Sequence, residues 1–162
     1  MLSKQLFTLI GLVAICACES SKTFDKYISI VDGWERSKPA TFSFKAPDTL
    51  FNYNLFLKLR VDQDFEYSNI FLMAKLQHPS GKIVRDTLEY KMADPSGTLL
   101  GTGFAVKESV LWYKGHEKPF VFTENGQYEL SIFNAMRPYD MVKADENLEG
   151  VMDVGFSIEK TQ

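Results

Sequence analysis

Hydrophobic and polar residues alternate with a period of two along much of the chain. The clearest run puts Leu55, Leu57, Leu59 and Val61 on one face and leaves the other face to the residues between them. Successive side chains of a strand point to opposite faces, so this pattern is typical of a strand with one buried side. No stretch of sequence shows a long apolar stripe of period 3.6, and helix is expected at most as a short piece around 134–137 or within 140–149.

The pattern predicts further strands of similar length, separated by turns. The expected strands cover residues 41–44, 55–61, 70–76, 84–92, 110–113, 120–122, 128–133 and 154–158. Turn signals that contain Gly, two of them with Pro, stand at 78–81, 94–97 and 124–126. Many short strands with such turns predict an all-β fold, a single antiparallel β-sandwich or jelly-roll-like domain over residues 27–162.

Tyr128 opens the predicted strand that follows the turn at 124–126. Its position resembles the tyrosine corner of β-sandwiches, in which the hydroxyl turns back onto upstream backbone. A buried Tyr needs a partner for its one polar atom, so we predict that Tyr128 is buried and bonded near residues 122–125. The alternative is an exposed Tyr on the outer face of the strand.

The first residues differ from the rest of the chain. Lys4 precedes an apolar run over residues 6–15, as in a secretory signal peptide. A run of about ten residues is too short to cross a membrane, which takes about 20. Residues 1–17 are therefore predicted to be a cleaved lipoprotein signal peptide.

The order Ile15-Cys16-Ala17-Cys18 resembles a bacterial lipobox, with a small residue directly before the acceptor cysteine. Cys16 has the bulky Ile15 before it and fails this requirement. We therefore predict lipid attachment at Cys18, a polar tether over residues 18–26, and a membrane as the first partner. The alternative is that both cysteines are apolar filler of an ordinary signal peptide.

Composition narrows the function. Of 162 residues, 45% are hydrophobic and 14% aromatic, which indicates a folded domain, and the net charge of −3 gives no footprint for nucleic acid. His78 and His116 stand beside turn residues with no carboxylate or thiol at ligand spacing, so both are expected to be exposed. We predict no catalytic residue, no metal site and no cofactor.

Two other groups of residues have a functional and a structural interpretation. The carboxylates in 62–66 partly resemble a calcium loop but lack its Gly and distal Glu. A solvated loop is favoured there, and also for the acid-rich stretch 143–150. Four aromatics form a possible sugar-stacking platform, although filling of the core is favoured for them; they are Trp34, Trp112, Tyr113 and Tyr139.

Several segments together resemble one family. They are the lipobox at Cys18, Tyr27–Ile30 with Gly33-Trp34, Asn69–Leu72, Asp86–Thr98 with Leu100–Gly103, Leu111–Lys114, and Gly126–Tyr128 through Ala135–Arg137. In these segments the chain is similar to the gliding motility lipoprotein GldH family of the Bacteroidota.

This resemblance implies a palmitoylated lipoprotein of the cell envelope, in the outer membrane, that is needed for gliding and associated with type IX secretion. Its partners are then other gliding or secretion proteins, and no small-molecule substrate is expected. Two alternatives stay open, a glycan-binding lipoprotein module of a nutrient-uptake system and a small envelope hydrolase.

Overall fold

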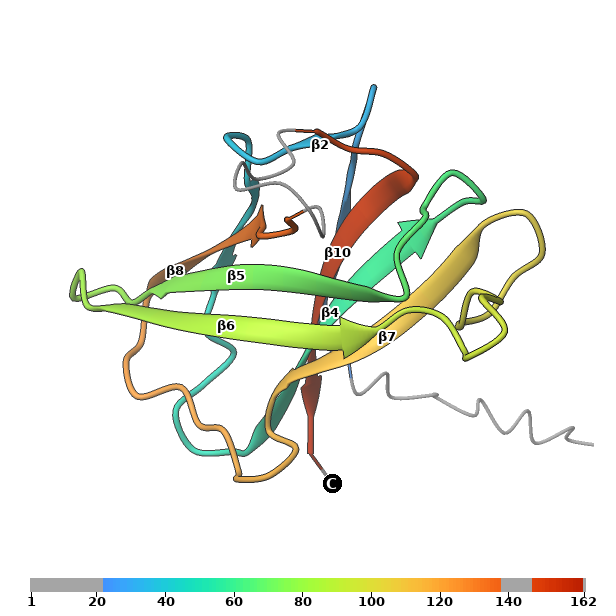
Figure 1. Cartoon of the computed structure of the whole chain (residues 1–162). Coiled ribbons are helices and arrows are strands. Elements are labelled where there is room, and N and C mark those ends of the chain that lie inside the picture. The colour runs from blue at the N-terminus through green and yellow to red at the C-terminus, as the bar shows by residue number, and fades with distance from the viewer. Residues whose placement is uncertain (1–21, 138–146, 162) are drawn as a thin grey trace, which may run out of the picture.

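The computed structural model describes residues 22–137 and 147–161, and over these ranges the chain is an antiparallel β-sandwich without helices (Figure 1). Accordingly, no helix within the two ranges is long and apolar enough to cross a membrane. The strands are β1 (Lys22–Ser29), β2 (Trp34–Glu35), β3 (Ala40–Lys45), β4 (Tyr53–Val61), β5 (Asn69–Gln77), β6 (Ile83–Lys91), β7 (Lys107–Lys114), β8 (Gln127–Asn134), β9 (Asn147–Leu148) and β10 (Val151–Lys160).

Two four-stranded sheets form the layers of the sandwich. The first has the order β1-β10-β4-β7 and the second the order β3-β8-β5-β6, while β2 and β9 form a small separate pair. Figure 1 shows β5 and β6 running across β10, β4 and β7, so the strands of the two layers cross. The predicted all-β sandwich is confirmed.

The core lies between the inner faces of the two sheets. In β4 the buried inner residues are those that the alternation predicts, and β5 buries every second residue in the same way. Aromatic rings fill the space between the layers: Phe44 stacks on Tyr128 with centroids 5.8 Å apart and contacts Phe156 at 5.2 Å. The period of two therefore follows from burial of one face of each sheet.

The tether predicted over residues 18–26 is too long, because β1 already begins at Lys22. Phe24 explains the difference: its ring lies 5.5 Å from Phe44 and 5.7 Å from Phe156, centroid to centroid. The aromatic contact draws this polar segment into the sandwich as an edge strand.

Two other expectations are wrong. Residues 120–122 form no strand, since Phe120 makes only an isolated bridge to Tyr53. Residues 134–137 are not helical, because β8 continues to Asn134, whose side-chain oxygen then accepts a hydrogen bond from the Met136 amide at 2.8 Å.

The predicted tyrosine corner is confirmed. Tyr128 is fully buried, and its hydroxyl donates to the Glu124 carbonyl at 3.1 Å and accepts from the Glu124 amide at 3.2 Å. The turn it closes contains Gly126 at a φ of 134°, a backbone conformation that favours glycine.

Candidate functional site

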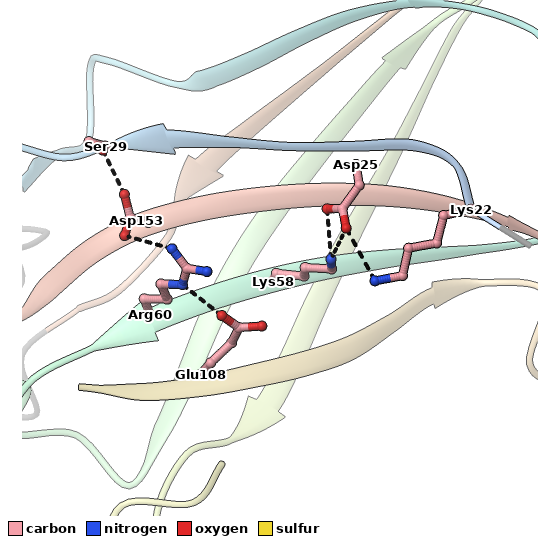
Figure 2. A network of polar contacts seen from close by, with 7 residues as sticks. All are labelled: Lys22, Asp25, Ser29, Lys58, Arg60, Glu108 and Asp153. Carbon is pink, nitrogen blue, oxygen red and sulfur yellow. Dashed lines mark hydrogen bonds and ion pairs between the residues drawn. The ribbon is translucent and has the colours of Figure 1, made fainter. Parts of the chain in front are cut away.

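Charged residues gather on the outer face of the first sheet, turned away from the core. Cross-strand register builds the rows of this face: Ser29, Asp153, Arg60 and Glu108 lie opposite one another on successive strands. With Lys22, Asp25 and Lys58 they form the group that we call the charged face (Figure 2).

Lys58 lies at the centre of the charged face and is almost completely buried, with 4% of the residue exposed. Its ammonium donates to both oxygens of Asp25, at 2.7 and 2.8 Å, and Lys22 approaches the same carboxylate at 3.2 Å. Figure 2 shows Asp25 between the two lysines. A buried ammonium costs free energy unless it is paired, so this contact satisfies Lys58.

Arg60 forms the second half of the charged face. Its Nε donates to Glu108 at 2.6 Å, and its Nη1 lies 3.6 Å from Asp153. Asp153 in turn accepts a hydrogen bond of 2.7 Å from the Ser29 hydroxyl. This chain of contacts ties β1, β10, β4 and β7 together across their full width.

Tyr27 lies flat between the two halves. The guanidinium of Arg60 lies 4.1 Å from its ring centroid and the ammonium of Lys58 lies 5.3 Å from it, which are cation–π geometries. The ring crosses Gly155, where an added Cβ would come within 2.7 Å of two ring carbons. Gly155 is therefore the residue that lets Tyr27 lie against the sheet.

The charged face keeps its ionisation states. Burial acts to raise the pKa of Asp25, but the hydrogen bonds from Lys58 and Lys22 outweigh it and the pKa is lowered. The pKa of Glu108 is lowered in the same way, by Arg60 against burial. Burial, together with Glu108, raises the pKa of Tyr27 to about 12. These acids stay ionised and the phenol stays neutral, which suits a fixed surface more than proton transfer.

An apolar strip adjoins the charged face along β7. The Trp112 ring, 40% of whose residue is exposed, packs on Phe56 at 4.4 Å and on His116 at 4.8 Å, centroid to centroid. Val110, opposite Lys58 on the same face, is more exposed still.

The loop between β6 and β7, residues 92–106, holds the most exposed aromatic side chain of the described residues. Asp94 fixes the loop by accepting hydrogen bonds from the Ser96 and Thr98 amides at 2.8 and 3.0 Å. Thr102 pairs with Glu108 on β7 through two backbone hydrogen bonds of 2.9 and 2.8 Å.

Phe104 projects from this fixed loop with 99% of the residue exposed. The loop is held in place, yet it exposes the whole phenyl ring to water. An exposed apolar side chain of this kind is typical of an interaction surface and not of the core. Leu100 and Val106 are partly exposed beside it in sequence. With Val110 and Trp112 these residues form what we call the apolar rim.

The two sheets are linked at the edge that carries this rim. Asp86 of β6 accepts hydrogen bonds from the Tyr113 hydroxyl at 3.0 Å and from Lys114 at 2.9 Å. The Tyr90 hydroxyl donates to the Trp112 carbonyl at 2.6 Å. These bonds cross from one layer to the other and hold β7 in position.

The two histidines differ in their exposure to solvent. His116 is exposed, as predicted. His78 is buried instead, because the turn that it begins folds its ring against Tyr128 at 5.0 Å, and its Nδ1 lies 3.4 Å from Glu124. Within residues 22–137 and 147–161, no three His, Cys, Asp or Glu side chains gather as a metal site would require.

The aromatic candidates do not come together on one exposed surface. Trp34 and Tyr113 are buried, which agrees with filling of the core, and Trp112 alone of the three described is exposed. In the stretch 62–66, Phe65 is buried and anchors the loop, while Asp62 accepts a hydrogen bond from the Asp64 amide at 3.0 Å.

Several predictions fall outside the described residues. They are the signal peptide over 1–17, the lipidated Cys18, the platform residue Tyr139, the possible helix in 140–146 and the acidic residues at 143–146. They stay predictions.

The charged face itself was missed by sequence reasoning. The signal was present in β4, where Lys58 and Arg60 occupy alternate positions of an otherwise apolar strand. Their partners Asp25 and Glu108 belong to strands far away in sequence, so only the register brings them together.

The fold and this face define an all-β sandwich domain with a charge-paired sheet surface. The profile of the family described as GldH lipoprotein matches residues 22–158. The chain is 41% identical to the gliding motility lipoprotein GldH homolog of Christiangramia forsetii, over 96% of this chain and 93% of that protein. It is 38% identical to the gliding motility lipoprotein GldH of Flavobacterium johnsoniae, over 94% and 93%. The chain therefore belongs to the GldH lipoprotein family.

Among solved structures, the comparison returns that of infectious bursal disease virus, Gx strain, at 12% identity and a TM-score of 0.33. The match covers 85% of this chain and 32% of the viral chain. A second structure of the same virus, the Gt strain, has a TM-score of 0.20. Both likenesses are too weak to indicate a shared fold.

Proposed function

We propose that the chain is a non-catalytic lipoprotein, acylated on Cys18 and anchored in the outer membrane, that supports gliding motility and type IX secretion by binding partner proteins. Membership of the GldH lipoprotein family is the observation that carries this proposal. The lipobox order at residues 15–18 supports the anchor, because Ala17 is the small residue that cleavage requires.

The apolar rim supports partner binding. Phe104 is held out by a loop that Asp94 and the pairing of Thr102 with Glu108 keep fixed. Preorganisation lowers the entropy lost on association. Burial of one phenyl side chain contributes about 2–3 kcal/mol, and its loss would weaken binding about 30- to 150-fold.

The charged face, which adjoins the apolar rim along β7, also supports the proposal. Its acids and bases neutralise one another and keep the first sheet rigid. A domain built in this way offers partners a defined surface.

Deletion of the gene in a host that glides, or that has type IX secretion, tests the proposal. We expect loss of spreading or of the secreted proteins, and recovery when wild type is restored. Phe104→Ser should recover only part of the function, whereas Val31→Ser, at a loop residue 78% exposed, should recover all of it. Normal spreading and a normal secretome in the deletion strain would refute the proposal, and loss of growth on one polysaccharide would support the glycan-binding alternative.

A further inference from the structure

One end of the sandwich carries the start of β1. Lys22 pairs with Glu159 near the end of β10, and β10 pairs onward with β4, where Glu159 lies opposite Asn54 and Lys160 opposite Tyr53. Neighbouring strands lie about 4.8 Å apart, so the start of β1 and the start of β4 are about 10 Å apart. We call this end the tether end. In Figure 1 it is the lower end, where the C-terminus and the loop at 46–52 lie.

The loop at 46–52 turns two large apolar side chains into solvent at the tether end. Leu50 is 83% exposed and Phe51 is 46% exposed. A polar residue fixes the loop in this form: one oxygen of Asp48 accepts hydrogen bonds from the Leu50 and Phe51 amides at 2.8 and 3.0 Å, and the other accepts from the Tyr53 hydroxyl.

A lysine stands over the exposed ring. The Lys160 ammonium lies 3.3 Å from the centroid of Phe51. The C-terminal strand is held beside the loop by a hydrogen bond of 2.9 Å from the Thr161 amide to the Asn52 carbonyl. Apolar side chains beside a long cationic one are the combination found at membrane surfaces, where the lysine stem lies along apolar groups and its charge reaches the phosphates.

The chain leaves little distance between this end and the lipid. Cys18 precedes Lys22 by four residues, and four residues span at most about 14 Å even when fully extended. An acyl group on Cys18 would therefore hold the tether end within the reach of the headgroup layer, which is about 5–8 Å deep on each side. The opposite end of the sandwich, where Val31 is exposed, would lie farthest from the bilayer.

We propose that Leu50 and Phe51 contact the phospholipid bilayer itself and, with Lys160 on the headgroup phosphates, fix the orientation of the domain on the membrane. This inference rests on the proposed acylation of Cys18. In this orientation the charged face and the apolar rim lie on the sides of the domain, between its membrane-facing end and its far end. Val31 points away from the bilayer.

The test uses the full lipidated protein in phospholipid vesicles, with a single introduced cysteine that carries an environment-sensitive fluorophore. Leu50→Cys is compared with the matched control Val31→Cys, which is similarly exposed at the far end. We expect the probe at position 50 to shift to shorter wavelength and to lose emission when the lipids carry a nitroxide near the headgroup, whereas the probe at position 31 stays unchanged.

Three outcomes would overturn the inference, and each points to a different failure. An unquenched probe at position 50 in a protein shown by mass spectrometry to be acylated refutes the membrane contact alone, and equal quenching at both positions refutes the orientation. If a wild-type chain that begins at Cys18, as checked by mass spectrometry, takes up the thiol label, Cys18 is not acylated, and the anchor fails together with the contact.

Discussion

Breaking the central ion pair of the charged face from its two sides should have unequal effects. Among the ion pairs of the described residues, Asp25 is the only carboxylate that contacts Lys58. Asp25→Asn removes this charge and leaves the Lys58 ammonium unpaired, although only 4% of Lys58 is exposed to water. Lys58→Met keeps the apolar stem of the side chain and removes the charge. Asp25 then retains Lys22 at 3.2 Å and is open to water, since 31% of its side chain is exposed.

The magnitudes follow from this difference in burial. Removing one partner of a fully buried pair costs about 3–5 kcal/mol, and the partial exposure of Asp25 reduces this to about 1–3 kcal/mol for Asp25→Asn. Replacing the buried cation by an apolar side chain of similar length is often close to neutral, so Lys58→Met should change stability by less than about 1 kcal/mol.

Urea unfolding of the domain measures both changes in stability. They appear as shifts of the midpoint concentration, while the slope of the unfolding free energy against urea concentration stays constant. The double variant Asp25→Asn/Lys58→Met should recover most of what Asp25→Asn loses, because no buried charge is then left unpaired. If Lys58→Met proves as destabilising as Asp25→Asn, the buried ammonium is not the cause and this explanation fails.

The same pair predicts a pH dependence. The pKa of Asp25 is lowered in the folded protein, because the hydrogen bonds from Lys58 and Lys22 outweigh burial. A lowered folded pKa means that its stabilisation is complete above the unfolded value of about 4 and is lost as the pH falls through the folded value. Asp25→Asn should therefore flatten the loss of stability in acid, and an unchanged acid limb would contradict the assignment.

Three other changes test separate parts of the molecule. Tyr128→Phe should destabilise the domain by about 1–3 kcal/mol, because the part-buried Glu124 amide loses its acceptor; a melting temperature equal to that of wild type would refute this. Gly155→Ala should cost about 1–3 kcal/mol by displacing the Tyr27 ring, and Tyr27→Ala in the same chain should relieve part of the cost measured by urea unfolding. Cys18→Ala should abolish incorporation of a radioactive fatty acid and Cys16→Ala should not; equal labelling of wild type and Cys18→Ala would refute the lipobox.

The fold was predictable where one face of a strand is buried and the other is not. In β4 and β5 the alternation identifies the inner residues, since burial of one face imposes a period of two. It fails for β1, an edge strand whose exposed lysines and Asp25 hide the inward Phe24. Edge strands carry such charges commonly, so a sequence of this kind is easily taken for a linker.

The site was less predictable than the fold. Burial of His78 depends on a ring contact with Tyr128, fifty residues further along the chain, which no local pattern records. The charged face depends in the same way on the pairing of β1 and β7 with β10 and β4. The tyrosine corner was predictable, because the hydroxyl of Tyr128 bonds only four residues back, to Glu124.

The position of β10 in the first sheet also governs when the domain can form. β10 is the last strand of the described residues, yet it stands between β1 and β4 and pairs with both. A chain that is made or delivered from its N-terminus has β1, β4 and β7 early, but β1 has no neighbour to pair with until Val151–Lys160 arrives. Contacts between the two ends of the chain are slow to form. The first sheet is thus completed only when Val151–Lys160 is available to pair with both β1 and β4.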